Sequence, residues 1–208
     1  MKKLHIILDI DNTLIDSLSS YDYFRFKSEI RMPDAKFDEA NMYIWKRPHL
    51  EQFLSYLNKT ASHISIWTNG TDGWLKFIFN NIIKPHLDES KITFLLSIDF
   101  STQIQINKDN FISKVPVKEM KKIFNNNSFG FSHHNTILID DNFYNCWFNK
   151  YNSIPSKKYL IINEKLKKNK DLLYIIKIIE KLKKSDNISD TLKRVYDGID
   201  NYNDLFDH

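Results

Sequence analysis

The stretch LHIILDIDNT, residues 4–13, sets the architecture of this 208-residue chain. Residues 4–9 form a short apolar run with β-branched side chains, which is typical of a strand buried on both faces of a sheet. Asp9 and Asp11 follow at the end of that run. Two carboxylates in this position can serve as a nucleophile beside an acid/base group. The alternative is that they only form a turn after the strand.

Strand-like and helix-like segments alternate along the rest of the chain. Apolar runs predict further strands at residues 64–68, 93–98, 136–139 and 159–162. Apolar residues three and four positions apart predict helices at residues 46–57, 74–82, 116–124, 170–182 and 191–196, with Pro48 in the first turn of the first helix and Thr71 or Asp72 as the cap of the second. This alternation predicts the α/β class, with a three-layer, doubly wound parallel sheet.

Residues 17–45 lack a helical period and contain scattered aromatic side chains. We expect a small flap or hairpin inserted after the first strand. The aromatic side chains could line a groove for a phosphopeptide, but a flap also needs such side chains simply to pack, and packing is the simpler explanation.

The length suits one well-buried domain, residues 1–208, and we find no internal repeat or linker. The single cysteine cannot form an internal disulfide, and Asp9 interrupts the first apolar run too early for a signal peptide. No stretch approaches the roughly 20 apolar residues that a membrane span requires. We therefore expect an intracellular, cytoplasmic or nuclear, monomer without membrane association.

The net charge is +4, and lysines are concentrated between residues 157 and 184. Basic helices at about residues 165–198 explain this cluster without a partner. Nucleic acid binding is possible but not favoured, because a basic balance alone gives only non-specific attraction.

Polar side chains follow three of the predicted strands. In parallel sheets, ligands bind beyond the carboxyl ends of the strands, so these side chains should converge. The residues concerned are Asp9 and Asp11 after the first strand, Thr68 and Asn69 after the second, and Asp140 and Asp141 after the fourth. Taken singly, Thr68 could merely cap a strand and the last acidic pair could cap a helix.

Four carboxylates in one crevice repel each other unless a cation binds between them. Oxygen ligands without histidine or cysteine suit Mg²⁺, which shares its coordination sphere with phosphate. With only four glycines, the chain lacks a glycine-rich phosphate loop, so side chains and strand-end amides must hold the phosphate. The pair His133-His134 has no further ligand at suitable spacing and is interpreted as part of a surface loop.

These motifs resemble those of the haloacid dehalogenase superfamily, and in particular its NLI-interacting-factor-like, or RNA polymerase II C-terminal-domain phosphatase, branch. The resemblance covers roughly residues 4–196. It is carried by LDIDNTL (8–14), KRPHLEQFL (46–54), WTNGT (67–71), VKEM (117–120) and IDDN (139–142).

The resemblance implies a role for each site residue. Asp9 would attack phosphorus and form an aspartyl phosphate, Asp11 would shuttle the proton, and Thr13 would fix the turn. The resemblance also implies that Asp9, the carbonyl of Asp11 and Asp140 hold Mg²⁺, with Asp141 binding through water, and that Thr68, Asn69 and Lys118 hold the phosphoryl oxygens.

Two departures from the branch concern the second half of the chain. Residues 93–115 are hard to match, so Lys118 is preferred to Lys108, Lys114 and Lys121 as the phosphate-binding lysine, although it could also be a solvent-exposed helix lysine. The branch often has Ser-Pro after its acidic pair, where this chain has Asn142 and Phe143. No catalytic group is lost by that change.

The predicted function is therefore a Mg²⁺-dependent phosphatase that acts on phosphoserine or phosphothreonine in proteins. There is no room for a large cap between Thr13 and Thr68, which leaves the site open to macromolecules. The same open site could accept a nucleic-acid 3′-phosphate or a small phosphate ester. A non-catalytic binding module on the same fold is the remaining alternative.

Overall fold

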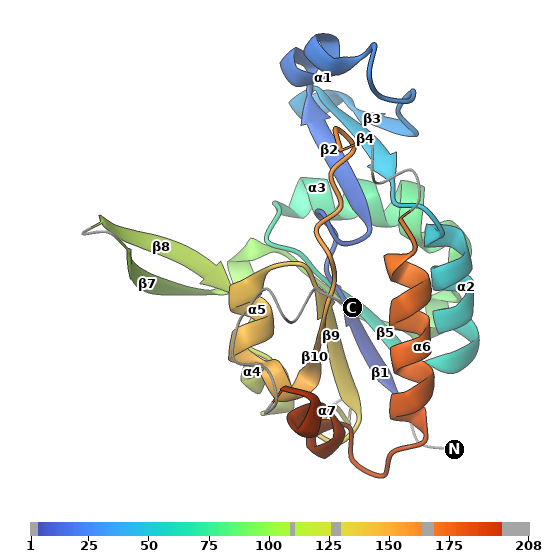
Figure 1. The fold of residues 1–208 in the computed structure, drawn as a ribbon, viewed down its shortest axis with the longest axis vertical. Coiled ribbons are helices and arrows are strands. Elements are labelled where there is room, and N and C mark those ends of the chain that lie inside the picture. Colours follow the sequence, from blue (N-terminus) through green and yellow to red (C-terminus); the bar gives the residue numbers. More distant parts are fainter. Residues whose placement is uncertain (1–3, 109–110, 126–129, 164–168, 197–208) are drawn as a thin grey trace.

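A computed structural model describes residues 4–108, 111–125, 130–163 and 169–196 (Figure 1). Its centre is a five-stranded parallel sheet with the strand order β10-β9-β1-β5-β6. The strands are β1 (His5–Leu8), β5 (His63–Trp67), β6 (Ile92–Leu96), β9 (Thr136–Asp140) and β10 (Ser153–Pro155). The predicted α/β class and doubly wound sheet are confirmed.

The strand order reverses beside β1. The chain runs from β1 outward through β5 to β6 and then returns to place β9 and β10 on the other side of β1. In open α/β sheets, the crevice at such a reversal is the usual place for a ligand. Asp9 directly follows β1, and Asp140 is the last residue of β9, so both acids lie at this crevice.

Helices cover both faces of the sheet, with α2 and α6 on one side and α4 and α5 on the other (Figure 1). The helices are α2 (Leu50–Thr60), α3 (Asp72–Ile78), α4 (Lys121–Phe124), α5 (Phe143–Phe148), α6 (Asp171–Lys183) and α7 (Ile188–Tyr196). Short 3₁₀ turns lie at Asp38–Ala40, Lys84–His86, Glu89–Lys91, Ile98–Phe100 and Lys150–Asn152, and a π turn lies at Phe79–Ile83. None of the described helices combines the length and the apolar character needed to cross a bilayer.

The alternation of side chains along β1 determines which face carries the acids. Ile6 and Leu8 pack into the larger core with α2, α3 and α6, whereas Ile7 packs into a smaller core on the other face. Because successive side chains of a strand point to opposite faces, Asp9 leaves the sheet on the face of Ile7. The same reasoning places Asp140 on that face, since Leu138 belongs to the smaller core.

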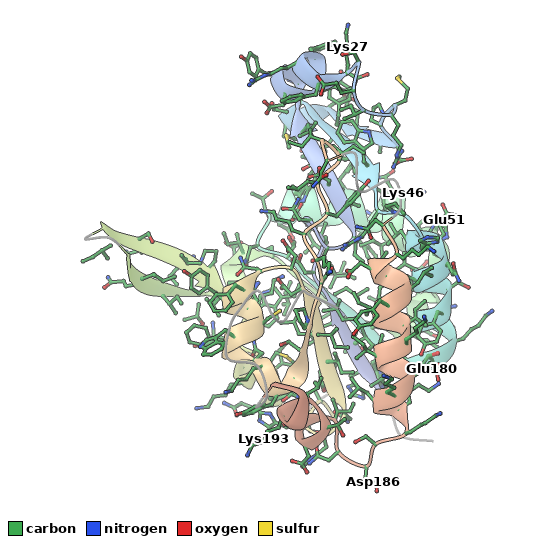
Figure 2. All side chains as sticks on the ribbon, viewed as in Figure 1. Lys27, Lys46, Glu51, Glu180, Asp186 and Lys193 are labelled. Carbon is green, nitrogen blue, oxygen red and sulfur yellow. The ribbon has the colours of Figure 1, made fainter. Side chains whose placement is uncertain are left out.

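The predicted insertion after the first strand is a three-stranded antiparallel flap, which rises beyond the carboxyl ends of the parallel strands (Figure 1). It consists of β2 (Ile15–Ser19), α1 (Ser20–Phe26), β3 (Ala35–Phe37) and β4 (Met42–Lys46), paired in the order β2-β4-β3. Figure 2 shows Lys27 at its far end and Lys46 where it returns to the body of the protein.

Packing accounts for only part of the aromatic content of the flap. Trp45 and Phe37 are buried, and Tyr23 stacks on Tyr43 with ring centroids 4.1 Å apart. In contrast, Tyr21 and Phe24 are 76% and 58% exposed. The interior of the flap therefore needs the first group of aromatic side chains and not the second.

A second hairpin precedes the helix predicted at residues 116–124 and includes the first two residues of that prediction. It is formed by β7 (Thr102–Lys108) and β8 (Phe111–Val117), and it projects away from the sheet (Figure 1). Pro116 pairs with Gln103 inside this hairpin, and the helix α4 begins only at Lys121. The buried residues Val117, Met120 and Ile123 have helical spacing, but only the last of them is helical, so the prediction was wrong for residues 116–120 and is confirmed for residues 121–124.

The strand predicted at residues 159–162 is also absent, and the fifth strand is β10. The backbone of this segment bonds to the loop after β1 and to β2 of the flap instead of to the parallel sheet. The Tyr159 N–H donates to the Asn12 carbonyl (2.8 Å), and the Ile161 N–H donates to the Asp16 carboxylate (2.6 Å). A three-residue edge strand that contains Pro155 gave too weak a signal to be predicted.

The helix predicted from residue 46 begins four residues later. Pro48 and His49 form a turn, with His49 at a φ of 66°, and α2 starts at Leu50. Pro48 therefore precedes the helix instead of lying in its first turn. The next helix, α3, is capped by Thr71, whose hydroxyl accepts from the Trp74 N–H (3.3 Å).

A buried arginine joins the loop after β1 to the C-terminal part of the chain. The Arg47 guanidinium donates to the Thr13 carbonyl (2.9 Å), the Ser156 hydroxyl (2.6 Å) and the Lys157 carbonyl (2.6 Å). It also forms an ion pair with Asp171 at 3.1 Å. Arg47 belongs to the KRPHLEQFL motif, but the sequence pattern did not indicate this structural role.

Arg47→Lys should lower the free energy of unfolding by about 2 kcal/mol. A lysine keeps the positive charge, but it lacks the planar guanidinium group that donates to several acceptors at once. Urea unfolding of the two proteins measures the difference. Arg25→Lys, at an exposed position of α1, is the control and should change stability by less than about 0.5 kcal/mol. Equal stability of the wild type and Arg47→Lys would contradict the assigned role.

Candidate active site

A buried ammonium group lies between two carboxylates at the reversal of strand order. Lys118 Nζ donates to Asp9 Oδ1 (2.5 Å) and to Asp140 Oδ2 (2.7 Å). The side chains of Lys118 and Asp140 are fully buried, and the Asp9 residue is 5% exposed. The contact joins three segments that are far apart in the sequence, so the fold itself brings these predicted residues together.

The hairpin and α5 position Lys118. This lysine directly follows β8, and its backbone N–H donates to the Asn145 side chain (3.0 Å) while its carbonyl accepts from Asn149 (2.6 Å). Lys118 is therefore neither helical nor solvent-exposed, in contrast to one of the interpretations that its sequence allowed. Of the rival lysines, Lys114 and Lys121 are exposed, and the side chain of Lys108 lies outside the described residues.

Negative charge exceeds positive charge at this site. One oxygen from each of Asp9, Asp140 and Asp141 lies within 4.8 Å of the others. Burial raises the pKa of Asp9 well above its ordinary value, and the neighbouring carboxylates add to this effect. Burial alone would lower the pKa of Lys118, but attraction to Asp140 and Asp9 outweighs it and raises that pKa. The lysine therefore stays charged and still leaves the three acids undercompensated.

The donor set fits a hard divalent cation. Asp9 Oδ2 is buried and has no hydrogen-bond partner among the described residues, although buried carboxylate oxygens are normally satisfied. Asp141 is the third carboxylate of the cluster. Burial and the neighbouring Asp140 raise the pKa of Asp141 to about 7. Mg²⁺ prefers oxygen ligands, and it usually binds one or two carboxylates together with water and phosphate oxygens. The three carboxylates therefore fit a Mg²⁺ ion, and Asp9 Oδ2 is available to bind it.

Asp11 lies in a different environment from Asp9, and its side chain does not belong to the three-carboxylate cluster. The Thr68 hydroxyl donates to Asp11 Oδ2 (2.9 Å), and Trp74 Nε1 donates to Asp11 Oδ1 (2.8 Å). Burial raises the pKa of Asp11, although both hydrogen bonds oppose that shift. The two aspartates of the motif therefore have distinct partners, as separate chemical roles require.

Thr13 links the loop after β1 to the end of β9. Its hydroxyl accepts from the Asp141 N–H (3.0 Å) and donates to the Asp141 carboxylate (3.3 Å). Beside it, Asn12 has a φ of 60°, a conformation that asparagine tolerates better than most residues. The Asn12 side chain donates to Asp16 (3.0 Å) and to the Tyr159 carbonyl (3.1 Å), a bracing contact that sequence reasoning missed.

The end of β5 contributes two polar residues whose side chains are already engaged. The buried Thr68 hydroxyl accepts from the Gly70 N–H (2.9 Å) in addition to its bond to Asp11. The Asn69 amide donates to the Pro116 carbonyl (3.3 Å), and its oxygen accepts from the Ser101 hydroxyl (2.7 Å). Phosphate binding by these two residues stays a prediction.

Asn142, not the acidic pair, caps α5. Its side chain accepts from the N–H groups of Tyr144 (2.9 Å) and Asn145 (3.4 Å), while its own N–H donates to Asp140 Oδ1 (2.8 Å). Asn145 also donates to Asp140 Oδ2 (2.9 Å). The spacing of Asn145 and Asn149, four residues apart on one helix face, was the signal that could have identified them as supports of the site.

The histidine pair is not part of this site. His133 and His134 are exposed, and His133 Nδ1 lies 3.0 Å from the Asn152 side-chain oxygen. The interpretation as a surface loop is confirmed.

Comparison with known proteins relates the chain to phosphatases. The sequence profile described as NLI interacting factor-like phosphatase matches residues 4–189. A CTD phosphatase-like protein of Invertebrate iridescent virus 6 is 30% identical over 141 residues, which cover 66% of this chain and 75% of the viral protein. The counterpart in Invertebrate iridescent virus 3 is 34% identical over 86 residues, 39% of this chain and 45% of that protein.

Among solved structures, the chain is similar to Fcp1, described as an essential RNA polymerase II CTD phosphatase. The identity is 17% and the TM-score is 0.49, over 96% of this chain and 55% of the solved one. The fission yeast enzyme bound to beryllium fluoride gives 19% identity and a TM-score of 0.47, over 85% and 51% of the two chains. The chain thus spans about half the length of these solved structures.

The family profile extends over nearly the whole described part of the chain, from β1 into α7, and includes each segment that contributes to the site. The 30% identity to the first viral relative agrees with it. The chain belongs to the NLI interacting factor-like phosphatase family, the branch of haloacid dehalogenase-type phosphatases that its motifs resemble.

Proposed function

We propose that the protein is a Mg²⁺-dependent phosphomonoester hydrolase in which Asp9 is the nucleophile and Asp11 the general acid/base. The observation that supports this most directly is the separation of the two carboxylates. Asp9 contacts Lys118 within the acidic cluster, whereas Asp11 is held apart by Thr68 and Trp74. Two carboxylates with different surroundings can hold different protonation states and perform different steps.

In the first step, an oxygen of Asp9 forms a bond to phosphorus, and the bond from phosphorus to the ester oxygen breaks. Asp11, protonated because burial raises its pKa, gives its proton to the departing oxygen. The products are the free alcohol and phosphorylated Asp9. Lys118 neutralises negative charge on the transferring group throughout this step.

In the second step, water attacks the phosphorylated Asp9. Asp11, now ionised, accepts a proton from that water, and inorganic phosphate leaves while the Asp9 carboxylate is restored. Asp9, Asp140 and the backbone carbonyl of Asp11 would hold Mg²⁺, with Asp141 binding through water. The ion would supply positive charge opposite the phosphoryl oxygens. Thr68, Asn69 and Lys118 would bind the same phosphoryl group.

Phosphoserine or phosphothreonine in a protein is the substrate class that we propose. The only insertion between β1 and β5, apart from α2, is the flap, so this fully described part of the chain contains no larger cap over the acids. The viral relatives carry names that describe them as CTD phosphatase-like, which points to the same class. A nucleic-acid 3′-phosphate would meet the same open edge of the sheet and is the competing substrate.

The test compares substrates under one set of conditions. The purified protein with Mg²⁺ should release phosphate from phosphoserine and phosphothreonine peptides faster than from a 3′-phosphorylated oligonucleotide, and EDTA should abolish both reactions. Activity confined to the oligonucleotide would reject the protein substrate while keeping the chemistry. No hydrolysis of any phosphate ester would indicate a binding module instead.

Mg²⁺ should bind more tightly as the pH rises through about 7, where Asp141 loses its proton. A raised pKa means that this carboxyl is protonated below that pH, so the ion must displace a proton. Affinity measured by calorimetry should therefore fall up to about tenfold per pH unit below 7. Asp141→Asn should weaken this dependence to the part that Asp9, whose pKa burial also raises, still contributes. A constant affinity between pH 6 and 8 in the wild type would contradict the prediction.

A further inference from the structure

Two side-chain donors from different parts of the chain bind the two oxygens of Asp11. Thr68, at the end of β5, bonds to Oδ2 at 2.9 Å, and Trp74, in α3, bonds to Oδ1 at 2.8 Å. A single hydrogen bond would leave the carboxyl plane free to turn about its Cβ–Cγ bond. Donors on both oxygens fix that plane.

The indole of Trp74 is held in turn by its surroundings. Trp74 is 9% exposed, and the flap residue Phe37 packs against it edge-on, with ring centroids 5.6 Å apart. At Gly70, an added Cβ would lie only 2.5 Å from Cδ1 of the indole and 3.2 Å from the Thr68 hydroxyl. The ring therefore occupies space that a glycine at this position leaves open.

Trp74 cannot exchange a proton itself. An indole N–H only donates a hydrogen bond and does not titrate near neutral pH. Its contact with Asp11 therefore acts through the placement of the carboxyl group and through the pKa of that group, which the hydrogen bond lowers. Displacement of a proton donor by about an ångström can reduce a rate by orders of magnitude.

We infer that Trp74 is a positioning residue, which holds the Asp11 carboxyl group in line with the leaving oxygen of the substrate. The inference rests on the proposed function and adds a residue to it. Phe37 belongs to the flap, so the flap packs against the Trp74 indole that orients Asp11.

The leaving group provides the test. An alkoxide from phosphoserine must be protonated as it departs, whereas p-nitrophenolate leaves readily without a proton. Trp74→Phe, which removes the N–H and keeps an aromatic ring, should lower kcat/KM for a phosphoserine peptide about 10- to 100-fold. It should lower kcat/KM for p-nitrophenyl phosphate less than about threefold, because kcat/KM reports only the steps up to leaving-group departure.

Trp67→Phe is the matched control. Trp67 is also buried, and its Nε1 donates to the Ser101 hydroxyl at 3.2 Å instead of to a carboxylate. This exchange should change kcat/KM for both substrates by the same factor. Trp74→Leu, which also removes the indole N–H, should show the same selective loss and provides the test if Trp74→Phe does not fold.

A double variant separates positioning from general damage. In an Asp11→Asn background, Trp74→Phe should cause no further loss on the phosphoserine peptide. Equal losses on both substrates, or no loss on either, would overturn the inference. Inactivity of the wild type on every ester would instead reject the proposed function, so the two failures can be distinguished.

Discussion

Asp9→Asn should eliminate hydrolysis of phosphate monoesters, with a fall in kcat of about 10⁴-fold or more. The amide has nearly the shape of the carboxylate but cannot become the acyl phosphate on which both steps depend. Asp9 is buried beside Lys118 at the carboxyl end of β1, so no neighbouring carboxylate can take its place without a change in the sheet. Single-turnover assays with a phosphoserine peptide measure the loss.

The same substitution should not weaken the fold. Burial raises the pKa of Asp9 well above its ordinary value, which means that ionised Asp9 destabilises the folded protein at pH values above the pKa of the unfolded chain. Asparagine removes that penalty, and Lys118 keeps its bond to Asp140. In EDTA at neutral pH, the unfolding temperature of the variant should equal or exceed that of the wild type.

Asp72→Asn is the control for the exchange itself. Asp72 is an exposed aspartate at the start of α3, and it forms a surface ion pair with Lys76. This variant should keep both full activity and stability within about 0.5 kcal/mol of the wild type. Full activity in Asp9→Asn would reject Asp9 as the nucleophile. A large loss of stability would show that Asp9 is mainly a structural partner of Lys118.

Lys118→Met should reduce both activity and stability. The ammonium group is the one side-chain cation in direct contact with Asp9 and Asp140 among the described residues, so its loss leaves buried carboxylates without a counter-charge. Removal of one member of a buried pair typically costs about 3–5 kcal/mol. Loss of a cation that stabilises the transferring group should reduce kcat a further 10²- to 10³-fold, to judge from comparable electrostatic contacts, which contribute about 3–4 kcal/mol.

Bound Mg²⁺ should partly replace the missing charge of Lys118. Urea unfolding should therefore show a larger loss of stability in EDTA than in excess Mg²⁺. Lys121→Met, at an exposed position three residues further along the chain, changes the same groups outside the site and should be neutral in both assays. If the two variants behave alike, the assignment of Lys118 fails, and the choice among the lysines of this region reopens.

Local sequence patterns predicted the elements of the sheet that combine length with strong apolar character. β1, β5 and β9 are buried runs that end in polar residues, so their positions and the convergence of their ends followed from the sequence. The segment at residues 159–162 was misassigned because its backbone bonds to the loop after β1 and to β2 instead of to the parallel sheet, and Tyr159 is the one buried side chain within it. An apolar run indicates a strand, but the sequence does not show which segment its backbone will bond to.

In the candidate site, too, some residues could be predicted from local sequence and others could not. Asp9, Asp11 and Asp140 were identified from their positions at strand ends. The bond from Trp74 to Asp11 depends on the relative orientation of α3 and the loop after β1, and helical spacing marked Trp74 only as an apolar side chain. The contacts of Arg47 likewise involve segments up to 124 residues away, which no local pattern encodes.

The central position of β1 also determines when the site can form during folding. Of the five strands of the parallel sheet, β1 is synthesised first, but its two neighbours come much later, with His5 opposite His63 on one side and opposite Thr136 on the other. Such distant parallel pairings form slowly. Until β9 docks, Asp140 is absent and the edge of β1 is unpaired. A nascent chain that ends before β9 thus carries Asp9 and Asp11, but under the proposed mechanism it should not yet hydrolyse phosphate esters.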